Sequence, residues 1–223
     1  KHILKNGLEV ITIKKNTQIS SINIGIKVGA LNETLEEKGI SHFIEHMIFK
    51  GTENRTFQRL NDELESLGGE YNAYTDYSQT VYSISCLEEE FINGIELLSD
   101  MLINSKLPEE EVDKERGVIL AEIRSSKDSV EDFSFKRINE VAFEHSALKY
   151  DVAGLDENVK NFTRDQLYSY YKKYYVPNNS LITMVSSREH DDAIKEIEKY
   201  FGKWQPKEVK SLDVKDEKNK DIK

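Results

Sequence analysis

The segment His42-Phe43-Ile44-Glu45-His46 brings two imidazoles and a carboxylate together in five consecutive residues, in a chain with only five histidines among its 223 residues. Residues four apart lie on one face of an α-helix, so both imidazoles can reach a single tetrahedral metal ion. Glu45 projects from the neighbouring stripe of the same turn. The spacing therefore predicts a helix that carries a metal-binding face with a carboxylate beside it.

The order of these residues, with glutamate directly before the second histidine, is that of the inverted zinc-peptidase signature. In that chemistry zinc polarises a bound water, the glutamate takes a proton from it, and the water attacks a peptide carbonyl. The same pattern also fits two half-buried polar residues on a packed helix, because the neighbouring side chains are apolar: Phe43, Ile44, Met47, Ile48 and Phe49. A third ligand is needed to favour the metal site.

Candidates for that third ligand lie between Pro108 and Asp132. Proline at the start, acidic residues in the first turn and an apolar stripe predict one long helix over this range. Its face also carries Glu115 and Glu122, which are seven residues apart and so lie nearly in line, two turns from each other. Either glutamate alone is typical of a solvated helix surface, so each is a candidate ligand only if it lies close to the histidines.

Three longer blocks resemble a known family. The first block is Gly39-Ile40-Ser41-His42-Phe43-Ile44-Glu45-His46-Met47-Ile48-Phe49-Lys50-Gly51-Thr52. The second is Gly68-Gly69-Glu70-Tyr71-Asn72-Ala73-Tyr74-Thr75 with Gln79-Thr80-Val81-Tyr82, and the third is Lys114-Glu115-Arg116-Gly117-Val118-Ile119-Leu120-Ala121-Glu122-Ile123. They resemble, in this order, the active-site helix, the substrate-binding hairpin and the ligand-donating helix of the pitrilysin-like inverted zincins, in particular the branch with the mitochondrial processing peptidase β-subunits and their bacterial relatives.

The resemblance implies a site for one zinc ion. His42, His46 and Glu122 are the implied ligands, and Glu45 is the implied catalytic base. Glu115 is implied to be a second carboxylate of the catalytic machinery, which supports the site from behind the ligands.

The hairpin block implies a peptide clamp. The strand Glu70–Thr75 follows a glycine pair and alternates its side chains, and by resemblance it borders the zinc. Asn72 and Ala73 are therefore expected to pair their backbone with an extended substrate at a sheet edge. The family pattern is broken around His145, where relatives often carry Pro and Gly, and we expect His145 to be a structural or surface histidine.

The order of elements favours an α+β fold, with a largely antiparallel sheet and helices packed on one side. Strands are expected at 8–14, 19–28, 70–75, 80–86 and 181–185. Helices are expected around the histidine pair and at 57–67, 90–104, 108–132, on toward 144, at 163–175 and at 191–201. The glycine pair at 68–69 can take the positive φ of a helix C-cap, and Thr163 with Gln166 can form a capping box.

Composition fits a soluble enzyme of one domain, or at most two. The net charge of −10 and the absence of a basic patch argue against nucleic acid as a partner. No apolar run approaches the roughly 18 residues of a spanning helix, and the first five residues lack the layout of a signal peptide, so we expect no membrane partner and a cytoplasmic location. A single cysteine, Cys86, excludes an internal disulfide framework and is expected on the sheet.

Two segments are expected along the chain. Residues 1–205 should form a zinc-bearing peptidase domain, and residues 206–223, rich in Lys, Asp and Glu, a charged linker or tail toward a missing second domain. The resemblance implies that family members carry two such domains, in tandem or as two subunits, with peptide bound between them. Because this chain resembles only the metal-bearing half, we expect an excised domain or a subunit with a second homologous partner.

Three functions follow from these patterns. The first is a zinc endopeptidase that hydrolyses unstructured or presequence-like peptides by a metal-activated water. The second is a non-catalytic assembly or chaperone-like subunit on the same fold, although relatives of that kind have lost motif residues that this chain keeps. The third is zinc used only to stabilise the fold, which is disfavoured because three protein ligands leave one coordination position open.

Overall fold

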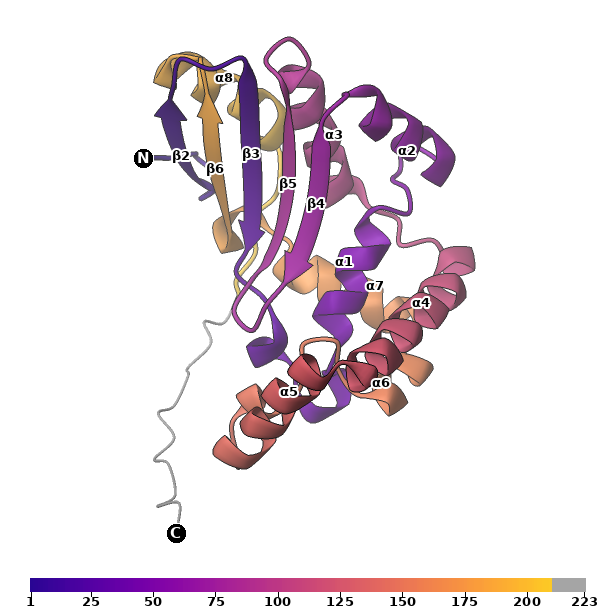
Figure 1. Ribbon diagram of the computed structural model, residues 1–223. Helices are drawn as coiled ribbons and strands as arrows, with labels where there is room; N and C mark the ends of the chain where they lie inside the picture. The colour runs from indigo at the N-terminus through magenta and orange to yellow at the C-terminus, as the bar shows by residue number, and fades with distance from the viewer. Residues whose placement is uncertain (210–223) are drawn as a thin grey trace.

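A single open sheet organises the chain in the computed structural model, which describes residues 1–209 (Figure 1). The strands are β1 (His2–Ile3), β2 (Glu9–Lys14), β3 (Ile19–Ile26), β4 (Glu70–Thr75), β5 (Thr80–Leu87) and β6 (Ser180–Ser186). Their order is β1-β2-β6-β3-β5-β4, and every pairing is antiparallel except that of β2 with β6. The expected largely antiparallel sheet is thus confirmed, with one parallel pair that makes it mixed.

Some of the helices cover one face of this sheet, and the others lie past the C-terminal end of strand β4, as expected for the α+β class (Figure 1). The helices are α1 (Ile40–Ile48), α2 (Phe57–Ser66), α3 (Phe91–Asn104), α4 (Glu109–Asp128), α5 (Val130–Ala142), α6 (Asp156–Asn161), α7 (Arg164–Tyr174) and α8 (His190–Phe201). Short 3-10 turns cover Ala30–Asn32, Leu35–Glu37, Ala147–Lys149 and Pro177–Asn179. None of the helices in the described part of the chain is long and apolar enough to cross a membrane.

Alternation along the strands explains why one face is covered. On β3, Ile22, Ile24 and Ile26 are fully buried, while the residues between them are only partly covered. In a strand successive side chains point to opposite faces, so this period of two marks one core face. Helices α3 and α8 pack on that face, and α1 runs beside β4 and β5 with its apolar residues inside the core. The helix with the histidine pair is therefore held on several sides by packed elements.

One expected helix is wrong: the range from Pro108 to Asp132 is not continuous. Helix α4 ends at Asp128, and Ser129 takes an extended conformation with φ −80° and ψ 118°. The Ser129 hydroxyl accepts a hydrogen bond from the backbone N–H of Asp132 and so caps the next helix, α5, which then ends at Ala142. Serine favours this local bond over a helix interior, which explains the break.

Other boundaries agree closely. The expected helix end is confirmed: Gly68, directly after the C-cap of α2, takes a positive φ of 62°. The expected capping box of Thr163 with Gln166 is also present at the start of α7. Cys86 is buried on β5, and the side chain of His145 is 80% exposed at the surface. The short elements β1 and α6 were not expected from the sequence.

The expected charged tail begins within the described residues and continues outside them, at 210–223. Lys207 is tied to Asn178: its backbone N–H donates to Asn178 Oδ1 (3.1 Å), and Asn178 Nδ2 donates to the Lys207 carbonyl (2.7 Å). Val209 packs against the core. The boundary at 205 and 206 stays a prediction.

Candidate active site

The start of helix α1 is held by a buried carboxylate. Gly39 begins the helix in a left-handed conformation, φ 101°, which glycine tolerates and which leaves no side chain to cap the first turn. Glu33 supplies the cap instead, since its carboxylate accepts hydrogen bonds from the backbone N–H groups of Gly39 (3.0 Å) and Ser41 (2.9 Å). Burial raises the pKa of Glu33 even though both hydrogen bonds favour its charged form. His42, the third residue of the helix, therefore lies within a capped first turn.

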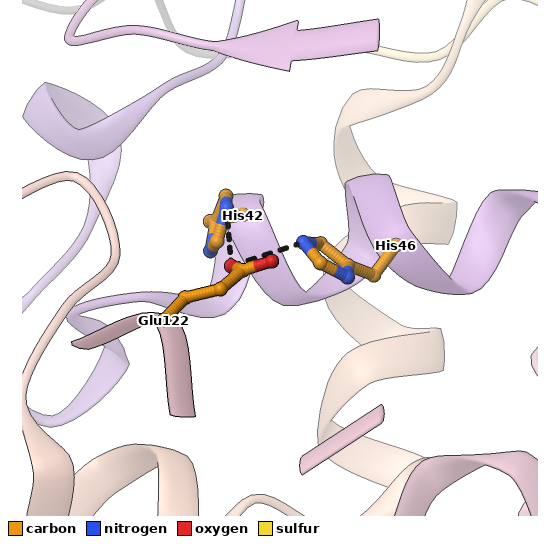
Figure 2. Close-up of side chains that lie close together, drawn as sticks. All are labelled: His42, His46 and Glu122. Atoms are coloured by element: carbon orange, nitrogen blue, oxygen red, sulfur yellow. Dashed lines mark ion pairs between the residues drawn. The ribbon is translucent and has the colours of Figure 1, made fainter. Parts of the chain in front are cut away.

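Three side chains converge from α1 and α4 (Figure 2). His42 Nε2 lies 3.8 Å from Glu122 Oε2, and His46 Nε2 lies 3.6 Å from the same oxygen. One ligand atom of each residue falls within 4.8 Å of those of the other two. The structure thus brings Glu122 next to two histidines that lie 76 or more residues earlier in the sequence.

The donor set fits a zinc ion. Ligands of tetrahedral zinc with bonds of about 2.0–2.1 Å lie roughly 3.4 Å from one another, close to the two nitrogen–oxygen distances in this group. Two imidazole nitrogens and one carboxylate oxygen are also the ligand types of catalytic zinc sites, which leave a fourth position for water or substrate. His42, His46 and Glu122 could therefore hold zinc with one position open.

His46 is oriented by a carboxylate on its other ring nitrogen. Its Nδ1 lies 3.2 Å from Glu115 Oε2, and Lys50 Nζ lies 2.7 Å from the second oxygen of that carboxylate. A proton on Nδ1 shared with Glu115 leaves the lone pair of Nε2 directed at the ligand group. Burial lowers the pKa of His46, but the hydrogen bond to Glu115 and the nearby carboxylates outweigh it, so the pKa is raised overall.

Glu115 remains charged in this arrangement. Burial raises its pKa, whereas the hydrogen bonds from His46 and Lys50 lower it, and the net shift is downward. The buried carboxylate thus accepts a hydrogen bond at each oxygen, one of them from the cation Lys50, which is the condition for a buried charge to persist. Lys50 also lies over the ring of Phe57, 4.9 Å from its centroid, and this contact limits its motion.

His42 has a different environment from His46. Its Nδ1 is buried and has no hydrogen-bond partner within the described residues. Burial, together with the charge of His46, lowers the pKa of His42 to about 4. His42 is therefore neutral at pH 7, which is the form that binds metal.

Glu45 lies beside this group and is only 9% exposed. Its Oε2 accepts a hydrogen bond from the hydroxyl of Thr75 at 2.5 Å. Burial raises the pKa of Glu45, and the bond from Thr75 and the charge of His46 offset only part of that rise. A carboxylate of raised pKa next to a metal site has the property required of a general base.

Strand β4 lies at the open edge of the sheet and pairs only with β5. The backbone N–H of Ala73 donates to the side-chain oxygen of Asn72 (2.9 Å) rather than to a neighbouring strand. Two residues further on, Thr75 reaches Glu45. The edge strand and the candidate base are therefore in direct contact.

A cavity of about 360 Å³ adjoins the candidate ligands. His42 and Glu122 form one side of it, and Tyr77 from the hairpin turn lines another. The Tyr77 hydroxyl donates to the carbonyl of Tyr150 (3.2 Å) and accepts from Asn139 Nδ2 (3.2 Å). This cavity is large enough for a side chain of a bound peptide next to the metal group.

All residues suggested by the sequence lie in or next to this one region. The structure brings the three candidate ligands within 4.8 Å of one another, places Glu115 3.2 Å from His46 and Glu45 next to His46 in the same helix, and puts Asn72 with Ala73 on the adjoining strand. Sequence reasoning did not single out Lys50 or Thr75. Lys50 lies just beyond the end of α1, four residues after His46, so its place in the sequence could have indicated it, whereas Thr75 approaches the site only because β4 packs beside α1.

Two family models match the chain. The first is described as Insulinase (Peptidase family M16) and covers residues 9–156, which include all candidate site residues. The second is described as Peptidase M16 inactive domain and covers residues 161–223.

Individual relatives agree with these matches. The chain is 33% identical over 201 residues to the probable mitochondrial-processing peptidase subunit beta of Arabidopsis thaliana, covering 90% of this chain and 38% of that protein. It is 35% identical over 199 residues to an uncharacterized zinc protease of Rickettsia felis, covering 89% and 48%. The crystal structure of a protease from Helicobacter pylori superposes with a TM-score of 0.90 at 25% identity, covering 98% and 53%. The chain spans about half the length of these proteins or less.

Proposed function

The chain belongs to peptidase family M16, the insulinase family, and from this premise we propose that it is the metal-bearing domain of a zinc-dependent endopeptidase. The single observation that carries the proposal is the approach of two histidine Nε2 atoms to one oxygen of Glu122, with the buried carboxylate of Glu45 beside them. A site built only to stabilise the fold needs neither a base nor an open position.

His42, His46 and Glu122 are the residues proposed to hold the zinc ion. When bound there, zinc acts as a Lewis acid that makes water more acidic and polarises the scissile carbonyl. Glu115 holds the His46 ring through Nδ1, and Lys50 keeps Glu115 charged.

Glu45 is the proposed general base. It takes one proton from the attacking water, whose oxygen forms the new bond to the peptide carbonyl carbon. It then gives that proton to the amine as the peptide C–N bond breaks, so one water is consumed for each bond cleaved. The raised pKa of Glu45 suits both steps, because burial favours the protonated form that the base must reach before it returns the proton.

The proposed substrates are unstructured or presequence-like peptides in an extended conformation. The open edge of β4 supports this class, since an extended backbone can pair with it as an additional strand. Asn72 and Ala73 form the clamp, with the Ala73 N–H free to leave the Asn72 side chain and bind a substrate carbonyl. A cytoplasmic location and a second homologous domain or subunit belong to the same proposal.

A non-catalytic assembly or chaperone-like subunit is the alternative. The family model that carries the word inactive in its description matches residues 161–223, which contain none of the candidate ligands. The part with the ligands matches the other model, and this division favours the enzyme.

Zinc content and peptide cleavage, measured on the same preparations, test the proposal. The full-length protein should hold about one zinc per chain. Glu45→Gln should keep that zinc while kcat/KM falls by about 10² or more, because the base is lost and no ligand is. His42→Ala should lose zinc, and the surface variant His145→Ala serves as the matched control with both properties unchanged. Loss of metal in Glu45→Gln, or its full activity, contradicts the assignment.

A further inference from the structure

The hydroxyl of Thr75 is the one hydrogen-bond donor to the candidate base within the described residues. It lies 2.5 Å from Glu45 Oε2, and the other oxygen of that carboxylate has no partner among residues 1–209. We propose that Thr75 is a positioning residue, which aims Glu45 so that Oε1 is the atom that exchanges the proton with water. This inference rests on the proposed peptidase function.

The proton of the Thr75 hydroxyl is directed by its surroundings. Two acceptors lie within reach, Glu45 Oε2 at 2.5 Å and the Thr80 hydroxyl oxygen at 3.5 Å. Hydrogen bonds to ionised acceptors are shorter and about twice as strong as those to neutral acceptors, so the Thr75 hydroxyl donates its hydrogen bond to the carboxylate of Glu45. Thr80 has its own acceptor, because its hydroxyl donates to the carbonyl of Val28 at 2.9 Å and remains a fixed neighbour of the pair.

Burial makes this bond decisive for the orientation of Glu45. The side chain is 9% exposed, and Oε1 is not among the fully buried atoms that lack a partner, so Oε2 is the oxygen that needs a donor from the protein. While Thr75 satisfies Oε2, the carboxyl plane is held at one end and Oε1 is left for chemistry. If the hydroxyl is removed, the carboxyl group must turn to find another partner, and the geometry for proton transfer is lost.

The same contact couples the base to the proposed clamp. Ala73 and Thr75 are two apart on β4, so their side chains lie on the same face of the strand, toward α1. A peptide paired with the outer edge of β4 would lie on the strand that also holds Glu45 in place. The strand therefore sets the distance between the substrate backbone and the base through one rigid element.

Three variants test the role of Thr75, each made in the complete protein with zinc bound. Thr75→Val removes the hydroxyl at nearly constant volume and should lower kcat by roughly 10-fold or more, with KM changed less than about twofold and zinc content unchanged. Thr75→Ser keeps a hydroxyl and should restore kcat to within about threefold of wild type. Thr80→Val is the matched control, because it removes the neighbouring hydroxyl in the same hairpin without touching Glu45, and should keep kcat near wild type.

Equal kcat for wild type and Thr75→Val overturns the role of Thr75 and leaves the peptidase proposal intact. An equal loss in Thr80→Val, or no rescue by Thr75→Ser, means that hairpin packing and not the hydroxyl sets the rate, and also overturns it. A wild-type protein that holds zinc but cleaves no peptide contradicts the proposed function and the role of Thr75 together.

Discussion

Two histidines one helical turn apart carry opposite pKa shifts. Both are largely buried, and burial alone lowers the pKa of an imidazole because it disfavours the charged form. His42 shows that effect, with a pKa of about 4, whereas His46 is raised because Glu115 accepts from its Nδ1 and Glu122 lies near its Nε2. The difference indicates that Glu115 places negative charge beside His46 only, so His46 is the more basic of the two histidines.

The first prediction at this scale concerns Glu115. Replacing it with Gln keeps a hydrogen-bonding group but removes the charge beside His46, so zinc affinity should fall by about 10- to 100-fold. Competition with a chelator of known affinity measures the change. Glu111→Gln is the control, since Glu111 is equally buried on the same helix but pairs with Lys114 away from the site, and it should leave zinc affinity unchanged.

Single residues differ in how far the sequence alone predicts them. The histidine pair follows from helical spacing, since positions four apart must share a face. Glu122 does not follow in the same way, because Glu115 lies on the same stripe and only family resemblance separates ligand from support. Thr75 could not be found at all, since its contact with Glu45 joins residues 30 positions apart and depends on how β4 packs beside α1.

At the scale of elements, Arg55, whose side chain is 9% exposed, connects three segments. It stands in the loop between α1 and α2, and its guanidinium pairs with Glu63 on α2 and with Glu96 and Asp100 on α3. Asp100 also accepts from the hydroxyl of Thr52 at 2.6 Å. This network holds the loop that follows α1 against α2 and α3.

The pH dependence of this network gives the second prediction. Burial raises the pKa of Asp100, but its hydrogen bonds with Thr52, Asn104, Asn54 and Arg55 outweigh that effect and lower the pKa below its ordinary 3.8. Its contribution to stability is therefore complete above about pH 4 and lost as the pH falls through the folded-state pKa. Asp100→Asn should cost about 2–4 kcal/mol of unfolding free energy at pH 7.

Urea unfolding at several pH values measures that loss. The difference in unfolding free energy between wild type and Asp100→Asn should narrow as the pH falls below about 4, because only the wild type has the Asp100 carboxylate charge to lose. Glu96→Gln is the control, since Glu96 is far more exposed and should cost less. A gap that stays constant down to the acid limit would mean that the carboxylate charge of Asp100 does not stabilise the fold.

The third prediction concerns the edge strand. Ala73→Pro deletes a backbone N–H that bonds only to the Asn72 side chain, so the variant should fold and keep its zinc. Its KM for peptide should rise several-fold, because a clamp donor is missing. Ala73→Gly is the control, since it changes the side chain at the same position but keeps the backbone donor. Global unfolding of Ala73→Pro would show that this N–H supports the sheet, and unchanged peptide kinetics would remove β4 from the binding site.

Elements were predicted better than their ends. The period of two in β3 and the apolar face of α1 are strong signals, because burial imposes them along the whole element. The break at Ser129 was missed because the acidic and polar residues on both sides continue a helical pattern, and only the hydroxyl bond to Asp132 N–H reveals the cap. The end of this helix is thus set by a local hydrogen bond, which hydrophobic periodicity does not reveal.

At the scale of the whole molecule, the site lies at a junction with one open side. Helices α1 and α4 cross near the end of the β4 strand, and α4 and α5 extend away from the sheet (Figure 1). The Glu122 side chain is 47% exposed, while both histidine side chains are less than 20% exposed. Water therefore reaches the candidate metal group from the Glu122 side, and this domain alone closes it only partly.

The last prediction follows from that openness. The chain spans about half the length of its relatives or less, so we expect the rest of such a protein to cover the open side. The isolated 223-residue chain should bind about one zinc ion, because all three candidate ligands lie within it. It should cleave peptides at least about 100-fold more slowly than the complete protein, since an open site neither orients the peptide fully nor excludes bulk water.

Complementation tests this expectation. Adding the remaining part of the protein as a separate polypeptide should restore cleavage in proportion to complex formation, measured by size-exclusion chromatography together with a peptide assay. The same mixture made with Glu45→Gln should stay inactive, which would assign the restored activity to this chain's own base. Full activity of the isolated chain, at dilutions where it is monomeric, would contradict the need for a second half, because one open domain would then hold and cleave the peptide unaided.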